Sequence, residues 1–175
     1  MKLSRTFLIA DTHFDHRNVI LYENRPWPTV QEMNEEMIKR WNAVVKPEDR
    51  VYHLGDVSMN RNGLLLAARL NGRKVLIKGN HDNQKLKDYL PIFDDIRATH
   101  LLNNFILSHV PVHPDQKYRF SGNIHGHLHG KNVLLPDGSI DPWYISVSVE
   151  HINYTPITLE QLEKRFYERN HNELG

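Results

Sequence analysis

The sequence contains no cysteine, and this absence narrows the chemistry that the chain can perform. Disulfide bonds, thiolate metal sites and cysteine nucleophiles are all excluded, so any metal must be held by nitrogen and oxygen atoms. Net charge is also small, because 22 basic residues are balanced by 21 acidic ones. Such a balance lacks the basic track with which proteins bind long nucleic acids. We therefore expect a small substrate and no extended nucleic-acid tract.

Long hydrophobic runs are missing as well. The apolar run before Asp11 is FLIA, which is too short for the core of a signal peptide or for a membrane span. We therefore expect a protein of the cytoplasm that does not enter a membrane. A length of 175 residues is typical of one domain, so we predict a single domain over residues 1–175. The sequence does not determine the oligomeric state.

Short apolar runs recur along the chain and predict buried strands. These runs cover residues 6–10, 51–54, 74–77, 105–107 and 144–149. A capping box formed by Thr29 and Glu32 predicts the start of a helix, which Pro47 ends. Further helices are predicted over residues 64–70 and after a second capping box at Thr158. The alternation of strands and helices indicates an α/β fold.

Polar clusters of Asp, Asn and His follow these strands, in a chain with 12 histidines. In chain order they are DTH (11–13), GD (55–56), GNHD (79–82), His109 and HGHLH (125–129). Each cluster alone has an ordinary explanation as a helix cap, a tight turn or a packed histidine. Ligands of α/β sheets bind beyond the carboxyl ends of the strands, so we expect the five clusters to converge.

This series of motifs resembles that of the calcineurin-like metallophosphoesterases, which runs DxH, GDxxD, GNH(D/E), H and GHxH. The resemblance extends from Asp11 to His129 and is strongest to the short stand-alone members of bacteria and phages. It implies a two-sheet β sandwich flanked by helices, with the metal site at the carboxyl ends of the strands. It implies that one metal is bound by Asp11, His13, Asp56 and His129, and the other by Asp56, Asn80, His109 and His127.

Two divalent cations would give this site a net positive charge, because only Asp11 and Asp56 among the ligands are anionic. A positive site suits a phosphate ester, and two metals can clamp the attacking and leaving oxygens. The nitrogen and oxygen donors favour Mn, Fe, Co, Ni or Zn over Ca and Mg, and we favour manganese. We expect a metal-bound hydroxide to attack the phosphorus.

His81 belongs to the GNHD motif but, by the resemblance, is not a metal ligand. Its imidazole suits a general acid that protonates the departing oxygen. In the family this histidine is often oriented by the last aspartate of GDxxD, where this chain has Met59. We therefore expect activated aryl diesters to be cleaved much better than esters with poor leaving groups.

Substrate contacts are expected from His16 and Arg17, just after DTH, and from His125, two residues before His127. A solvated basic turn is the ordinary alternative for Arg17. The predicted reaction is hydrolysis of a small or terminal phosphodiester, such as a cyclic nucleotide or a 2′,3′-cyclic phosphate. A phosphomonoesterase and a non-catalytic metal-binding scaffold are the alternatives, and the full set of ligands favours an enzyme.

Overall fold

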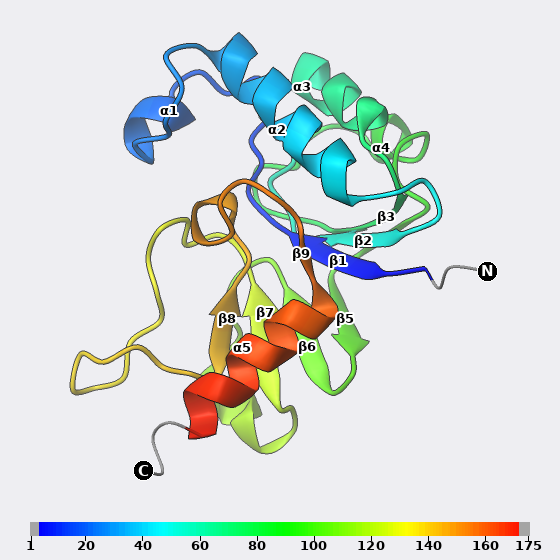
Figure 1. Cartoon of the computed structure of the whole chain (residues 1–175). Helices are drawn as coiled ribbons and strands as arrows, with labels where there is room; N and C mark the ends of the chain where they lie inside the picture. The colour runs from blue at the N-terminus through cyan, green and yellow to red at the C-terminus, as the bar shows by residue number, and fades with distance from the viewer. Residues whose placement is uncertain (1–3, 172–175) are drawn as a thin grey trace.

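A computed structural model of the chain describes residues 4–171 and contains two β-sheets (Figure 1). The first sheet has five strands in the order β4-β3-β2-β1-β9. Its strands are β1 (Thr6–Ile9), β2 (Arg50–His53), β3 (Arg73–Ile77), β4 (Asp95–Arg97) and β9 (Ile157–Thr158). Strands β1 to β4 are parallel to one another, and β9 runs antiparallel to β1. Their carboxyl ends therefore lie along one edge of the sheet.

The second sheet has four strands in the order β5-β6-β7-β8. They are β5 (Thr99–Leu102), β6 (Phe105–Ser108), β7 (Gly122–His125) and β8 (Tyr144–Ser146). Strands β6, β7 and β8 are parallel, and β5 is antiparallel to β6. The chain beyond β1 joins this sheet, because Ala10 donates to the Val147 carbonyl at 2.9 Å and accepts from Val149 at 3.1 Å. These bonds bring the carboxyl ends of β1 and β8 together.

Helices cover the sheets (Figure 1). On one side lie α2 (Val30–Val44), α3 (Arg61–Leu66) and α4 (Leu86–Tyr89), and α1 (Val19–Tyr22) lies beyond them at one end of the molecule. Helix α5 (Leu159–His171) lies across the four-stranded sheet, with Phe166 edge-on to Phe105 at a centroid distance of 5.1 Å. Short 3-10 turns occupy η1 (Ala67–Arg69), η2 (Pro114–Tyr118) and η3 (Val149–His151). The expected α/β arrangement of two sheets flanked by helices is confirmed.

The clearest helix of the sequence forms as expected. Thr29 is the N-cap of α2, its hydroxyl accepting from the Glu32 amide at 3.2 Å and donating to the Glu32 carboxylate at 2.9 Å. The helix buries Met33, Met37 and Trp41 on one face. That face holds α2 against the five-stranded sheet.

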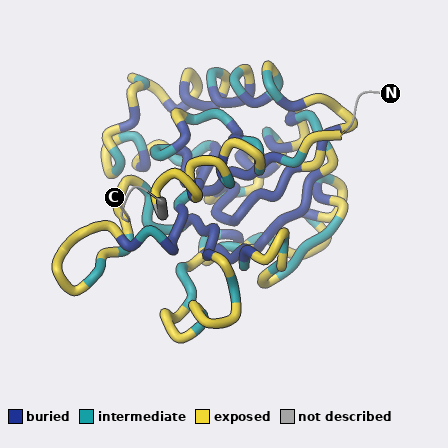
Figure 2. Tube along the Cα trace, turned by 60° about the horizontal axis from the view of Figure 1, so that its bottom comes forward, coloured by how far each residue is buried: buried dark blue, intermediate teal, exposed yellow. Residues whose placement is uncertain are grey.

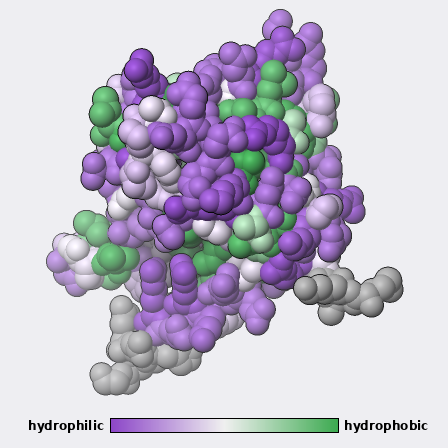
Figure 3. Space-filling view, turned by 45° about the horizontal axis from the view of Figure 1, so that its top comes forward, coloured by the Kyte–Doolittle hydropathy of each residue, from purple (hydrophilic) through white to green (hydrophobic). Residues whose placement is uncertain are grey.

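Burial follows the sheets. The strands run through the interior, while the outward faces of the helices and several loops are exposed (Figure 2). Apolar side chains of both sheets and of α2 and α5 belong to one buried cluster. The face in Figure 3 is mostly hydrophilic, and its apolar residues form separate patches. Because one buried apolar cluster joins the two sheets, the edge where they meet is held in place by the core on both sides.

Most predicted strands agree with the structure to within one residue at each end, but two predicted elements differ by three residues. The helix expected at 64–70 begins earlier, at the N-cap Asn60, whose side chain accepts from the Gly63 amide at 2.8 Å, and it tightens into η1 at Ala67. The strand expected at 144–149 ends at Ser146, because the next residues pair with Ala10 and then turn into η3. The short elements α1, α4 and β9 carry too little periodicity to be seen in the sequence.

Candidate metal centre

The polar clusters of the sequence meet beyond the carboxyl ends of β1, β2, β3, β6 and β7. Asp11, His13 and His129 form one group, in which a ligand atom from each residue lies within 4.8 Å of the others. Asp56, His109 and His127 form a second group by the same measure. We call these groups the Asp11 half and the Asp56 half of the centre. They bring together residues that are spread from position 11 to position 129.

Asp56 lies between the halves. Its Oδ2 atom is 3.4 Å from His109 Nε2 and 3.6 Å from His13 Nε2, so it contacts one histidine from each half. Its Oδ1 atom accepts from the His81 amide at 2.8 Å. Burial alone would raise the pKa of Asp56, but the hydrogen bond and charge of His109, with the His81 amide, lower it to about 2. Asp56 is therefore an anion with one oxygen directed at both halves.

Asn80 extends the Asp56 half. Its side-chain Oδ1 is 2.9 Å from His109 Nε2, the same nitrogen that faces Asp56. The other ring nitrogen, His109 Nδ1, donates to the Leu54 carbonyl at 2.7 Å. This bond leaves Nε2 with a lone pair once the ring is neutral, as a metal ligand requires.

The ligand side chains depend on an unusual backbone. Asp11, His13, Asp56, His127 and His129 all have positive φ, with values from 48° to 69°. Non-glycine residues adopt this region rarely, and each such residue costs free energy that the surrounding structure must offset. Five such residues at one site indicate that the loops are held in place to direct their side chains inward.

Close approach of the loops also requires small residues. A Cβ atom at Gly126 would lie 2.6 Å from Asp11 Oδ2, and one at Gly79 would lie 2.2 Å from Asp56 Oδ1. Real Cβ atoms do not approach that closely, so any side chain at these positions would displace a carboxylate. Glycine at these two positions of the motifs therefore makes room for Asp11 and Asp56.

The donor atoms fit metal ions. Both ring nitrogens of His13 are buried, and neither has a hydrogen-bond partner within residues 4–171. Burial lowers the pKa of His13 to about 2, so the ring is neutral and its nitrogen lone pair is free for a cation. Burial raises the pKa of Asp11 to about 6, against the lowering effect of His109 and His129. A cation bound between these groups would satisfy one of the two orphan nitrogens of His13 and stabilise the carboxylates of Asp11 and Asp56.

Several neighbours orient the carboxylates and loops. Asp11 accepts from the His127 amide at 2.9 Å and from the Ser148 hydroxyl at 2.7 Å. Asp82, the last residue of GNHD, is fully buried and accepts from three backbone amides, at 2.8 to 2.9 Å. Those amides belong to Asp56, Val57 and Gly79. Asp82 thus ties the loop after β3 to the loop after β2.

His81 lies beside the centre without joining either group of ligands. Its ring is 5.6 Å from that of His13, and the residue is half-buried. Met59 is 38% exposed and only its backbone carbonyl is engaged, by Gln84 at 3.4 Å. No side-chain hydrogen bond to the His81 ring occurs in the described part of the chain.

The three expected substrate contacts lie in different surroundings. The ring of His16 is 5.5 Å from that of His13, so it borders the Asp11 half. Arg17, the next residue along the chain, is exposed. His125 is buried, with its Nδ1 2.8 Å from the Gly126 carbonyl and its ring against Tyr144. His16 and Arg17 therefore remain proposed substrate contacts. The expected contact from His125 is not supported, because its ring is buried.

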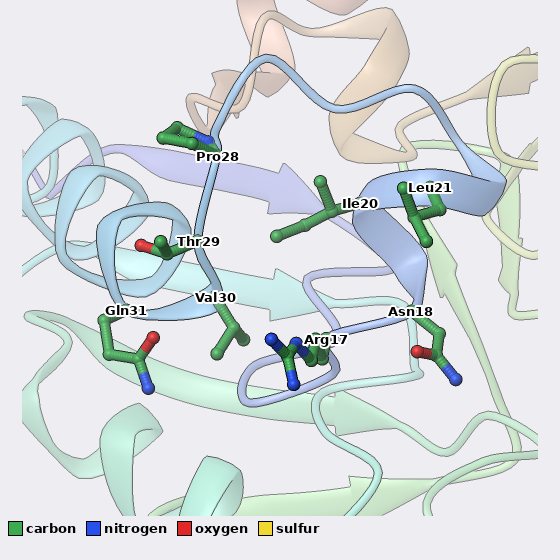
Figure 4. A pocket seen from close by; sticks show the side chains of 8 residues that line it. All are labelled: Arg17, Asn18, Ile20, Leu21, Pro28, Thr29, Val30 and Gln31. Carbon is green, nitrogen blue, oxygen red and sulfur yellow. The ribbon is translucent and has the colours of Figure 1, made fainter.

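A hollow of about 480 Å³ lies between α1 and the start of α2 (Figure 4). Ile20 and Val30 stand on opposite walls of it, with Arg17 at its base. None of the ligand residues lines this hollow. It is therefore not the metal centre itself.

Sequence reasoning missed the carboxylate behind His129. Glu150 Oε1 is 3.4 Å from His129 Nδ1, and the buried guanidinium of Arg25 donates to the same oxygen at 2.8 Å. Glu150 directly follows the apolar run 144–149, so it carries the same signal as the other polar residues at strand exits. Arg25 does not follow a strand. It lies in the loop between α1 and α2, directly before Pro26, so its position in the sequence did not point to the centre.

The sequence and the fold resemble those of several known proteins. No model of a known protein family matches the sequence. The protein is 26% identical to the Gene 66 protein of Mycobacterium phage L5 over 75% of this chain and 81% of that protein. Among solved structures, a protein of unknown function, AQ665 from Aquifex aeolicus, has a TM-score of 0.73 and 28% identity, covering 93% of this chain and 99% of that one. A novel archaeal phosphodiesterase has a TM-score of 0.49 and 19% identity, covering 81% and 82%.

Among the described residues, every helix is too short or too polar to cross a membrane.

The uncharacterized protein MJ1445 of Methanocaldococcus jannaschii is 39% identical over 173 residues, which cover 94% of this chain and 92% of that protein. Identity at this level over nearly the whole length of both chains places the protein in the same family as MJ1445.

Proposed function

We propose that this protein is a metal-dependent phosphoesterase that hydrolyses a small or terminal phosphodiester, such as a cyclic nucleotide or a 2′,3′-cyclic phosphate. The observation that carries the proposal is the position of Asp56, with one carboxylate oxygen 3.4 Å from a histidine of one half and 3.6 Å from a histidine of the other. An anion shared in this way is the arrangement that holds two cations side by side.

The proposed ligands divide between the halves. Asp11, His13, Asp56 and His129 would hold one cation, and Asp56, Asn80, His109 and His127 the other. When bound, the two cations supply Lewis acidity toward phosphate oxygens and lower the pKa of a water molecule. The donor set contains only nitrogen and oxygen, and we propose manganese as the metal.

His81 is the proposed general acid. Its backbone amide holds Asp56 Oδ1 while its ring stands 5.6 Å from that of His13, so it is close to both halves. A half-buried imidazole without a side-chain partner in the described residues is free to turn toward a substrate. In the proposed reaction its ring N–H gives a proton to the departing oxygen.

His16 and Arg17 are the proposed substrate contacts. Arg17 directly follows His16, and its exposed guanidinium would donate to phosphate oxygens of the ester. Among macromolecules we propose no nucleic-acid tract as a partner, because the charge is balanced. The cytoplasmic location expected from the sequence stays a prediction.

The proposal is tested by assaying chelator-stripped protein with bis-p-nitrophenyl phosphate and p-nitrophenyl phosphate, titrated in parallel with Mn²⁺, Ni²⁺, Zn²⁺ and Mg²⁺. We expect metal-dependent hydrolysis of the diester that is lost in Asp56→Asn. Preference for the monoester would replace the proposal with a phosphomonoesterase. Binding of two ions without turnover of either ester would replace it with a metal-binding scaffold.

A further inference from the structure

An arginine is buried behind the Asp11 half. The Arg25 side chain has no exposed surface, and its guanidinium donates to the carbonyls of Asp11 at 2.7 Å and Thr12 at 2.9 Å. Two further N–H groups donate to Glu150 Oε1, at 2.8 and 3.0 Å. A buried guanidinium is tolerated only when its donors and charge are matched, and Glu150 supplies the matching charge. Arg25 therefore fixes Glu150 relative to the loop that carries Asp11.

Glu150 in turn faces a proposed metal ligand. The same Oε1 atom is 3.4 Å from His129 Nδ1, and 9% of the Glu150 side chain is exposed. When Nδ1 carries the proton and donates to Glu150, the opposite nitrogen, Nε2, keeps its lone pair for a cation. A carboxylate that accepts this hydrogen bond also raises the basicity of the opposite nitrogen. The ring then binds a metal more strongly than it does when a neutral group accepts the bond.

Neither His13 nor His109 has such a partner in the described chain. His109 donates to a backbone carbonyl, and both ring nitrogens of His13 are without a hydrogen bond. The His127 ring has no hydrogen bond or ion pair with a carboxylate either, so among the described residues the carboxylate support belongs to the Asp11 half alone.

We infer that Glu150, held by Arg25, is a positioning residue that fixes the orientation and tautomer of His129 and so raises the affinity of the Asp11 half for its cation. This inference rests on the proposed function. It adds residues that touch neither the substrate nor the cation, and it predicts two cation sites of unequal affinity.

A competing use of Glu150 is a third cation site. A ligand atom of Glu23 lies within 4.8 Å of one from each of Glu150 and His129, and Glu150 Oε2 has no hydrogen-bond partner among the described residues. The Arg25 guanidinium, 2.8 Å from Glu150, would repel a divalent cation placed there. His129 would also have to ligate through both ring nitrogens. The geometry thus favours the positioning role.

The test measures metal binding without substrate. Chelator-stripped wild-type protein, E150Q and E150D are titrated calorimetrically with Mn²⁺, and their Co²⁺ complexes are compared by visible absorption. In E150Q we expect one of the two ions to bind roughly 10–100-fold more weakly, with a changed Co²⁺ spectrum, while the other ion binds as in the wild type. E150D keeps the charge and should lose less affinity.

E36Q is the matched control, because Glu36 pairs with Arg40 on α2, away from the centre, and the side chains of both are 30% exposed. Far-UV circular dichroism checks that each variant folds, and E150D decides the matter if E150Q does not fold. Unchanged affinity for both ions overturns the inference, as do three ions in the wild type and two in E150Q. Fewer than two ions bound by the wild type would remove the proposed function itself, which distinguishes the two failures.

Discussion

The two halves of the metal centre use the same kinds of ligand but support them differently. In the Asp56 half, His109 is oriented by a neutral backbone carbonyl at 2.7 Å. In the Asp11 half, His129 faces the carboxylate of Glu150, which a buried arginine holds in place. A carbonyl only orients a ring, whereas a carboxylate also adds charge behind it. On the proposed function, this difference is expected to make the two cations bind with unequal affinity.

Asp56→Asn should have the largest effect, because it breaks both halves at their common ligand. The substitution removes one negative charge between His13 and His109. We expect kcat/KM for bis-p-nitrophenyl phosphate to fall roughly 10³-fold or more, beyond the loss that a residue behind a ligand causes. Calorimetry should show weaker binding of both ions. Asp137→Asn, at an exposed loop, is the control, and an active Asp56→Asn enzyme would contradict a shared ligand.

His81→Ala should separate catalysis from metal binding. The ring contributes to neither half, so both ions should bind as in the wild type. We expect a loss of about 10²-fold or more in kcat with an alkyl leaving group and a smaller loss with p-nitrophenolate, which needs no proton. Wild-type protein should already favour the aryl diester, because no aspartate aligns His81 where Met59 stands. Equal wild-type rates on alkyl and aryl diesters would contradict this preference. An equal loss on both substrates in His81→Ala would remove His81 from the role of general acid.

Gly126→Ala and Gly79→Ala should each displace a carboxylate of the centre, Asp11 in the first variant and Asp56 in the second. The new Cβ would lie 2.6 Å from Asp11 Oδ2 in the first variant and 2.2 Å from Asp56 Oδ1 in the second. We expect each to lower the free energy of unfolding by about 1–3 kcal/mol, measured with urea. In metal titrations, Gly126→Ala should weaken mainly one ion and Gly79→Ala both.

Gly130→Ala is the matched control for these two variants, because its new Cβ would meet no atom within 4 Å. Its free energy of unfolding should stay within about 0.5 kcal/mol of the wild type. If all three variants behaved alike, the close approach of the loops would not explain the glycines.

The smallest effect concerns pH and the support of the Asp11 half. His53 is buried, with its Nε2 3.0 Å from the hydroxyl of Thr12, which lies between Asp11 and His13. Burial lowers the pKa of His53 from 6.5 to about 3. Above pH 6.5 the His53 ring is neutral in both the folded and the unfolded protein. As the pH falls from 6.5 toward 3, the unfolded protein takes up the proton first, so the free energy of unfolding decreases.

Urea unfolding of the metal-free protein at several pH values checks this sign. The decline in stability from pH 7 to pH 4 should be shallower in His53→Gln than in the wild type. His113→Gln, at an exposed histidine, should leave the slope unchanged. An equal slope in all three proteins would show that His53 does not contribute to the pH dependence.

Much of the centre was predictable because each ligand directly follows a buried apolar strand. Asp11, Asp56 and His109 stand one to three residues after β1, β2 and β6, and parallel strands bring such positions to one edge. Glu150 also directly follows an apolar run, 144–149, but it belongs to none of the five motifs, so the sequence analysis did not single it out. His125 misled for the opposite reason: the alternation that sets it beside His127 in an extended chain fails, because His127 has a φ of 69°.

By itself the sequence determined the donor chemistry and the order of the parts. Without cysteine, only nitrogen and oxygen can bind a metal, and the spacing of apolar runs sets where the loops emerge. Only the tertiary structure decided what stands behind each ligand. Arg25 and Glu150 are 125 residues apart, and Ser148 and Asp11 are 137 apart. Contacts at such separations depend on how the two sheets join, and no local pattern of residues records them.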